Sequence, residues 1–93
     1  MSTVDTLDSY RQELLDTVAE ILGDKVQPDD HFLDVRGDSL TAAIINDRLI
    51  ATRGCGVELS LFFESETLGE LADHWASLVT EAKAAESEAV NHG

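Results

Sequence analysis

The chain has few cysteines, prolines and basic residues: its 93 residues include one cysteine, one proline and six arginines and lysines. The single cysteine, Cys55, excludes an intramolecular disulfide. No basic segment followed by an apolar stretch marks a secretion signal, so we expect a cytoplasmic location. No apolar run is long enough to cross a membrane, and no glycine-rich phosphate loop or internal repeat is present.

Acidic residues dominate the charge. Nineteen aspartates and glutamates against six basic residues give a formal net charge of -13. Such a surface repels the phosphates of nucleic acids and of anionic lipids, so we expect neither nucleic acid nor a membrane as a partner. Hydrophobic residues make up 43% of the chain, which is typical of a folded domain, but the length is too short for most catalytic clefts.

Apolar residues at helical spacing predict amphipathic helices over residues 7–22 and from 39 to about 53. Glycines follow both segments and end them. The segment 59–64 is too short for periodicity to distinguish strand from helix. From Thr67 to Glu70 the spacing is that of a capping box, which predicts that a last helix starts there and that Glu70 reaches back to Thr67.

The remaining segments are predicted from their few apolar residues. Between the first two helices we expect a long ordered loop, which Phe32, Leu33 and Val35 pin to the core. Cys55 lies between two glycines, and we expect it in an exposed loop. Few bulky residues follow Glu81, so we predict a packed domain over residues 1–82 and a frayed tail over 83–93.

A serine in the run Gly37-Asp38-Ser39-Leu40 is the main candidate for chemistry. Ser39 falls at the predicted start of a helix, where backbone amides lack partners and the helix dipole is positive. A phosphodiester built on its hydroxyl would lie in a favourable field. The simpler alternative is that Asp38 or Ser39 only caps the helix.

Two blocks of the sequence resemble acyl and peptidyl carrier proteins, whose modified serine carries 4'-phosphopantetheine. They are Asp30-His31-Phe32-Leu33-Asp34-Val35-Arg36-Gly37-Asp38-Ser39-Leu40 and Phe63-Glu64-Ser65-Glu66-Thr67-Leu68-Gly69-Glu70-Leu71-Ala72. The separation from Ser39 to Thr67 is also similar. The resemblance implies an all-α bundle of three main helices plus one short helix over 59–64.

The resemblance also implies a non-catalytic carrier. Ser39 would hold the arm, supported by Asp38 and Gly37, and an aminoacyl, peptidyl or acyl group would be tethered to the arm as a thioester. Exposed Leu40 and Ile44 would serve as docking residues for partner enzymes. Coenzyme A would donate the arm through a phosphopantetheinyl transferase, and magnesium would belong to that transferase reaction.

Gly37 directly before Asp38-Ser39, together with Phe63-Glu64, is most similar to free-standing peptidyl carriers of nonribosomal peptide synthesis, including antibiotic biosynthesis. Arg36 departs from that pattern, since peptidyl carriers often have glycine there. Val57-Glu58-Leu59 also comes later than usual, which predicts a changed end of the second long helix or a changed loop after it. The implied partners are an adenylating or acyl-loading enzyme and condensation, ketosynthase or tailoring enzymes, acting on a monomer. An acyl carrier of polyketide synthesis, or an excised domain, remains an alternative.

Other functional classes fit the sequence less well than a carrier. The letters GDSL also name a serine hydrolase family, but the segment before Ser39 is not a buried strand, and Asp73 and His74 are helix neighbours that point in different directions. We therefore assign no catalytic residue. Metal binding is also not predicted, because His31, His74, His92 and Cys55 are dispersed. A non-covalent acidic interaction module stays open.

Overall fold

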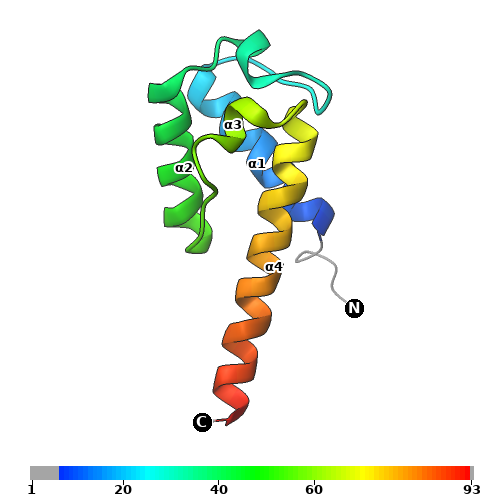
Figure 1. The fold of residues 1–93 in the computed structure, drawn as a ribbon, viewed down its shortest axis with the longest axis vertical. Helices are drawn as coiled ribbons and strands as arrows, with labels where there is room; N and C mark the ends of the chain where they lie inside the picture. The colour runs from blue at the N-terminus through cyan, green and yellow to red at the C-terminus, as the bar shows by residue number, and fades with distance from the viewer. Residues whose placement is uncertain (1–6, 93) are drawn as a thin grey trace.

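The computed structural model describes the backbone of residues 7–92 and the side chains of residues 7–83. Its elements are α1 (Leu7–Leu22), the 3-10 turn η1 (Phe32–Val35), α2 (Ser39–Arg53), α3 (Leu61–Glu64) and α4 (Leu68–His92). Within these residues no strand occurs, so the predicted all-α bundle of three main helices plus one short helix is confirmed. Figure 1 shows α1 packed beside α4, with η1 and α3 near one end of the bundle.

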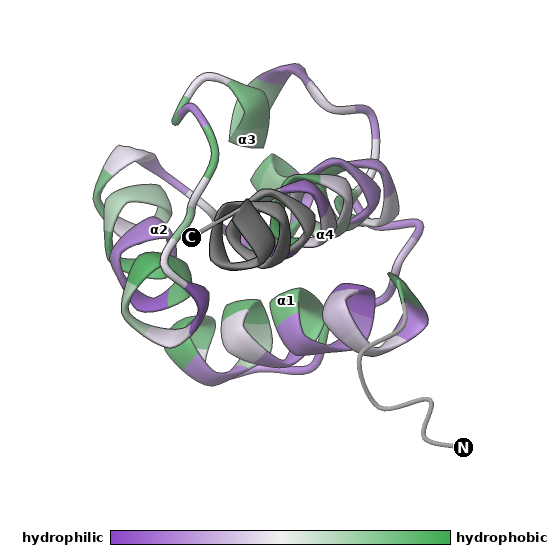
Figure 2. Cartoon of the chain, turned by 90° about the horizontal axis from the view of Figure 1, so that it is seen from below, coloured by the Kyte–Doolittle hydropathy of each residue, from purple (hydrophilic) through white to green (hydrophobic). Residues whose placement is uncertain are grey.

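Aromatic side chains from α1 and α4 form the centre of the core. Trp75 is fully buried and meets Tyr10 edge to face, with 6.3 Å between ring centroids. Figure 2, which looks along α4, shows the other three helices around it. The fully buried large aliphatic side chains come from every long helix: Leu14, Val18, Ile45, Leu49, Leu68, Leu71 and Val79. Burial of these apolar faces is the main force that holds the helices together.

The helix bounds follow the sequence pattern closely. The predicted ranges of α1 and α2 are confirmed, and the expected short third helix covers Leu61–Glu64. α4 continues to His92, past the predicted domain boundary at residue 82. The division into a packed domain over 1–82 and a frayed tail over 83–93 remains a prediction. Residues 1–6 and 93 lie outside the described part of the chain.

The start of α4 differs in one detail from the expected capping box. The Thr67 hydroxyl accepts a hydrogen bond from the Glu70 amide at 3.1 Å, as predicted. However, the Glu70 carboxylate accepts from the amide of Glu66 at 3.0 Å rather than from that of Thr67. The predicted donor was wrong by one residue, because the bend over residues 65–67 brings the Glu66 amide within reach of the Glu70 carboxylate.

The connection between α2 and α3 is held by side chains rather than by secondary structure. Gly54 ends α2 with a φ of 81°, a conformation that glycine adopts without steric cost. The Asn46 amide then bonds both the carbonyl and the amide of Val57, each at 2.9 Å. The Trp75 indole donates to the Cys55 carbonyl at 2.9 Å. These three bonds attach the connection to α2 and α4.

Candidate functional site

Ser39 is the first residue of α2, at the end of the bundle where the long loop from α1 arrives. Its side chain is exposed, and its hydroxyl forms no hydrogen bond with any residue that the structure describes. Of the two residues considered as caps, Asp38 performs that role. The hydroxyl of Ser39 is therefore not used for capping and faces solvent.

Asp38 and Thr41 form a reciprocal capping box around Ser39. The Asp38 carboxylate accepts from the Thr41 amide at 2.9 Å, and the Thr41 hydroxyl accepts from the Asp38 amide at 2.8 Å. The hydrogen bond from the Thr41 amide lowers the pKa of Asp38, and the Thr41 hydroxyl lowers it further. Thr41 was not predicted as part of this cap, although its position three residues after Asp38 is the spacing of such a box.

Gly37 lies against the ring of Phe32 so closely that no side chain fits between them. A Cβ atom built on Gly37 would stand 2.4 Å from two ring atoms of Phe32. The ring is buried and meets Phe62 and Phe63 at centroid distances of 5.2 and 5.6 Å. This aromatic cluster holds the backbone just before Ser39 against α3.

The three apolar residues of the loop do not all behave as expected. Phe32 is buried and Val35 packs against the core, which confirms two of the predicted anchors. Leu33, in contrast, is 55% exposed, so the prediction that it pins the loop was wrong. This part of the loop forms the 3-10 turn η1, in which the Leu33 amide donates to the imidazole of His31 at 3.0 Å. The turn directs the side chain of Leu33 outward.

The loop is also attached to the first turn of α4. The Asp30 carbonyl accepts from the Leu68 amide, and the Pro28 carbonyl accepts from the Gly69 amide, both at 2.7 Å. These bonds satisfy two amides that the start of a helix leaves free. The segment before Ser39 is therefore held by α4 on one side and by the Phe32 cluster on the other.

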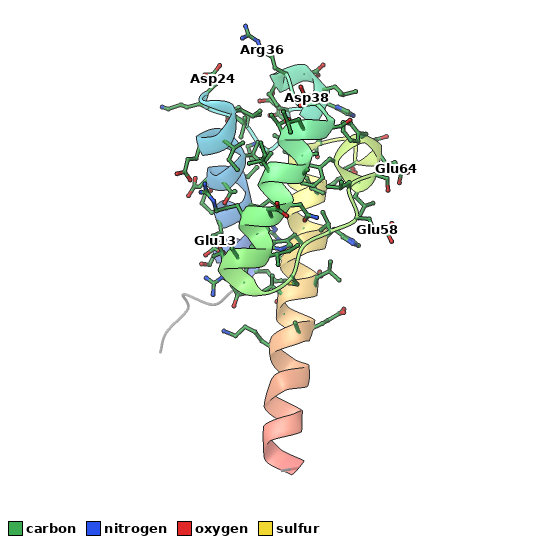
Figure 3. All side chains as sticks on the ribbon, turned by 90° about the vertical axis from the view of Figure 1, so that its left-hand side faces the viewer. Glu13, Asp24, Arg36, Asp38, Glu58 and Glu64 are labelled. Atoms are coloured by element: carbon green, nitrogen blue, oxygen red, sulfur yellow. The ribbon has the colours of Figure 1, made fainter. Side chains whose placement is uncertain are left out.

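Arg36 is the one non-glycine residue with a left-handed backbone among the described residues, with a φ of 71°. Its amide donates to the Leu33 carbonyl at 3.2 Å and closes η1. The Arg36 side chain is exposed and points away from the bundle at the end where Asp38 begins α2 (Figure 3). It forms no ion pair with the residues that the structure describes.

Apolar side chains lie exposed next to Ser39. Leu40 is 69% exposed and Ile44, one turn further along α2, is 43% exposed. The predicted docking residues are thus accessible and share one side of the helix, since residues four apart are neighbours on its surface. Exposed Leu33 belongs to the loop that leads to the same helix start.

The geometry offers little to the alternative chemistries. The Asp73 carboxylate pairs with Arg11 on α1, and His74 is exposed. No cluster of His, Cys, Asp or Glu that could hold a metal ion occurs among the described residues, which do not include the His92 side chain. Cys55 is half-buried against the core rather than exposed as predicted, and burial raises the pKa of its thiol. No helix of the described part is long and apolar enough to span a membrane.

Comparison with known proteins gives one family. A family model described as a phosphopantetheine attachment site matches residues 12–75, a range that contains Ser39 and the loop before it. Neither the curated proteins nor the solved structures provide a match.

Proposed function

Because this chain belongs to the phosphopantetheine-attachment family, and is therefore a carrier protein with a covalently attached 4'-phosphopantetheine arm, we propose that Ser39 is the residue that holds the arm. The observation that carries the proposal is the exposed hydroxyl of Ser39 at the start of α2, left free because Asp38 provides the cap. Ser60 and Ser77 are exposed too, but neither follows a comparable loop.

The residues present fit a phosphodiester at this place. The hydroxyl is accessible, and the first amides of α2 and the positive end of its dipole lie beside it. In the transfer from coenzyme A, the Ser39 oxygen forms a bond to phosphorus and gives up its proton. The bond from phosphorus to the adenosine bisphosphate breaks, and that nucleotide leaves. A phosphopantetheinyl transferase catalyses this step in such carriers.

When bound, the arm supplies a thiol on which an acyl or aminoacyl group is carried. The protein keeps the attachment point in place through the Gly37–Phe32 contact and the bonds from Leu68 and Gly69. A tether of this kind replaces diffusional encounter by a high local concentration near each docked enzyme. The chain itself does not change any bond of its cargo.

We assign the carrier to the peptidyl class of nonribosomal peptide synthesis, with an adenylating enzyme as its loading partner and a cytoplasmic location. The support is the sequence Gly37-Asp38-Ser39 and the Phe63-Glu64 pair, which packs beside Phe32 through Phe63. The alternative is an acyl carrier of polyketide synthesis. Exposed Leu40 and Ile44 are the proposed docking contacts in either case.

Intact-mass measurement of the apo protein tests the attachment site. Wild type, Ser39→Ala and the control Ser60→Ala are incubated with coenzyme A, magnesium and a broad-specificity phosphopantetheinyl transferase. We expect a mass gain of one arm in wild type and Ser60→Ala and none in Ser39→Ala. A gain in folded Ser39→Ala would refute the site, and no gain in any folded variant would favour a non-covalent interaction module. Loading the holo protein with amino acids or acyl groups then separates the two carrier classes.

A further inference from the structure

The loop before Ser39 is acidic, and its charge opposes the favourable field at the start of α2. From Val26 to Ser39 the chain carries four aspartates, at positions 29, 30, 34 and 38, and Arg36 is its one arginine or lysine. Asp29, Asp34 and Asp38 are exposed, and Asp30 is half-buried. Carboxylates repel an incoming phosphate group, and such repulsion acts over a screening distance of about 8 Å at physiological salt. A cation near Ser39 would reduce this repulsion.

Arg36 is placed to provide that cation. It precedes Ser39 by three residues, so their Cα atoms are at most about 11 Å apart, and a long side chain covers much of that distance. Its guanidinium is free of ion pairs among the described residues, whereas Arg48 pairs with Glu20 and Arg53 pairs with Glu13. The stick view shows it extending into the solvent beyond the bundle end where α2 begins (Figure 3).

The fold itself does not require an arginine at this position. With a φ of 71°, residue 36 adopts a conformation that favours glycine over any residue with a Cβ atom. The backbone amide of Arg36 closes η1, and the amide of a glycine would do the same. Stability therefore does not explain the side chain, whose chemistry suits a phosphate, since a guanidinium binds phosphate through two parallel hydrogen bonds.

We propose that Arg36 is a recognition residue that binds the phosphate transferred to Ser39, first in coenzyme A and then in the arm of the finished carrier. The inference rests on the proposed attachment at Ser39 and adds to it a residue with a defined ligand chemistry. Arg36 acts by drawing the phosphate toward the hydroxyl against the four aspartates. It takes no part in bond making.

Lys25 offers a matched control. Lys25 and Arg36 line the same cleft of about 350 Å³ between the end of α1 and η1, together with Asp24 and Asp34. Like Arg36, Lys25 is exposed and forms no ion pair with the described residues. Its removal changes the net charge by the same amount at the same end of the bundle, but it lies fourteen positions before Ser39 in the chain.

The first experiment measures arm transfer to wild type, Arg36→Gln, Arg36→Gly, Arg36→Lys and Lys25→Gln, with Ser39→Ala in parallel. We expect kcat/KM to fall at least about tenfold in Arg36→Gln and Arg36→Gly, because tenfold is the lower bound for the loss of even one of the two hydrogen bonds between charged groups. Lys25→Gln should stay within about twofold, and Arg36→Lys should recover part of the loss. Arg36→Gly should unfold at a temperature no lower than wild type, so misfolding would not explain its loss.

The second experiment observes the contact without any enzyme. In the holo protein, the side-chain Nε–H resonance of Arg36 in a ¹⁵N-correlated NMR spectrum should shift relative to the apo protein, while backbone resonances of α4 stay in place. Three results would overturn the inference. They are an unchanged Arg36 resonance, wild-type transfer rates in both Arg36→Gln and Arg36→Gly, and a loss of transfer rate in Lys25→Gln equal to that in the Arg36 variants. If Ser39→Ala is modified, the attachment site fails instead, so the two failures are distinguishable.

Discussion

Replacing Gly37 by alanine tests the contact that positions the loop before Ser39. The added Cβ would stand 2.4 to 2.5 Å from three ring atoms of Phe32, about 1 Å closer than atoms of packed side chains approach. The ring cannot simply withdraw, because Phe62 and Phe63 lie against it with centroids 5.2 and 5.6 Å away. Either the aromatic cluster or the backbone that leads to Ser39 has to shift.

Overpacking of this kind costs about 1 to 3 kcal/mol. A domain of this length has a free energy of unfolding of about 5 to 14 kcal/mol, so the variant should remain folded at room temperature. Its melting temperature should fall by about 4 to 8 °C for each kcal/mol lost. Gly37 does not have a positive φ, so the whole cost comes from steric contact with Phe32 and none from a forbidden backbone conformation.

Urea unfolding followed by the fluorescence of Trp75 measures this cost, since the chain has a single tryptophan and that residue is fully buried. Phe32→Leu removes the ring atoms that the new Cβ would meet, so the double variant should lose less stability than the sum of the two single variants. A difference of at least about 1 kcal/mol is expected for residues in direct contact. Strict additivity, or a Gly37→Ala variant as stable as wild type, would refute the reasoning.

Three further predictions concern the elements around the site. Asn46→Ala should lose about 1 to 3 kcal/mol, because it leaves the half-buried amide and carbonyl of Val57 without their partner; urea unfolding measures the loss. The pKa of Asp38 is lowered in the folded protein, so the carboxylate stabilises the fold at pH values above its ordinary pKa of 3.8. This stabilisation is lost as the pH falls from 3.8 through the lower pKa of the folded state. The melting temperature of Asp38→Asn should therefore fall less than that of wild type when the pH is lowered over this range. Leu40→Ala should raise the KM of a loading enzyme for the carrier without changing the stability of the carrier. Ile50→Ala, a control that also lies on α2 and is 46% exposed, should leave that KM unchanged. Equal effects of the two substitutions would contradict a docking role confined to the start of α2.

Local patterns predicted much of this molecule. The spacing of apolar residues and the glycines after each segment predicted both ends of α1, the start of α2 and approximately its end, because the free energy of an amphipathic helix depends on neighbours within one or two turns. A cap at the start of α2 was also predicted, but the sequence left open whether Asp38 or Ser39 provides it. The structure decides for Asp38, whose carboxylate accepts from the amide of Thr41, three residues away, so that the exposed hydroxyl of Ser39 is not used as a cap.

Contacts between distant segments were not readable. Phe32 and Leu33 are neighbours of similar hydrophobicity, yet one is buried against Phe62 and the other is exposed, and the direction of each depends on how η1 turns over α3. The bonds from Asn46 to Val57 and from Trp75 to Cys55 join segments 11 and 20 residues apart, and no periodicity marks such pairs.

The sequence by itself thus determined the helices, the acidic charge and the candidate serine, because propensity, capping and net charge depend on composition and short-range order. Only the tertiary structure decided which loop residues face the core, how the loop is attached to α4 through the Asp30 and Pro28 carbonyls, and where the exposed guanidinium of Arg36 projects. These features arise from the packing of segments that are far apart in the chain, and a side chain's direction is set there by the partner it meets.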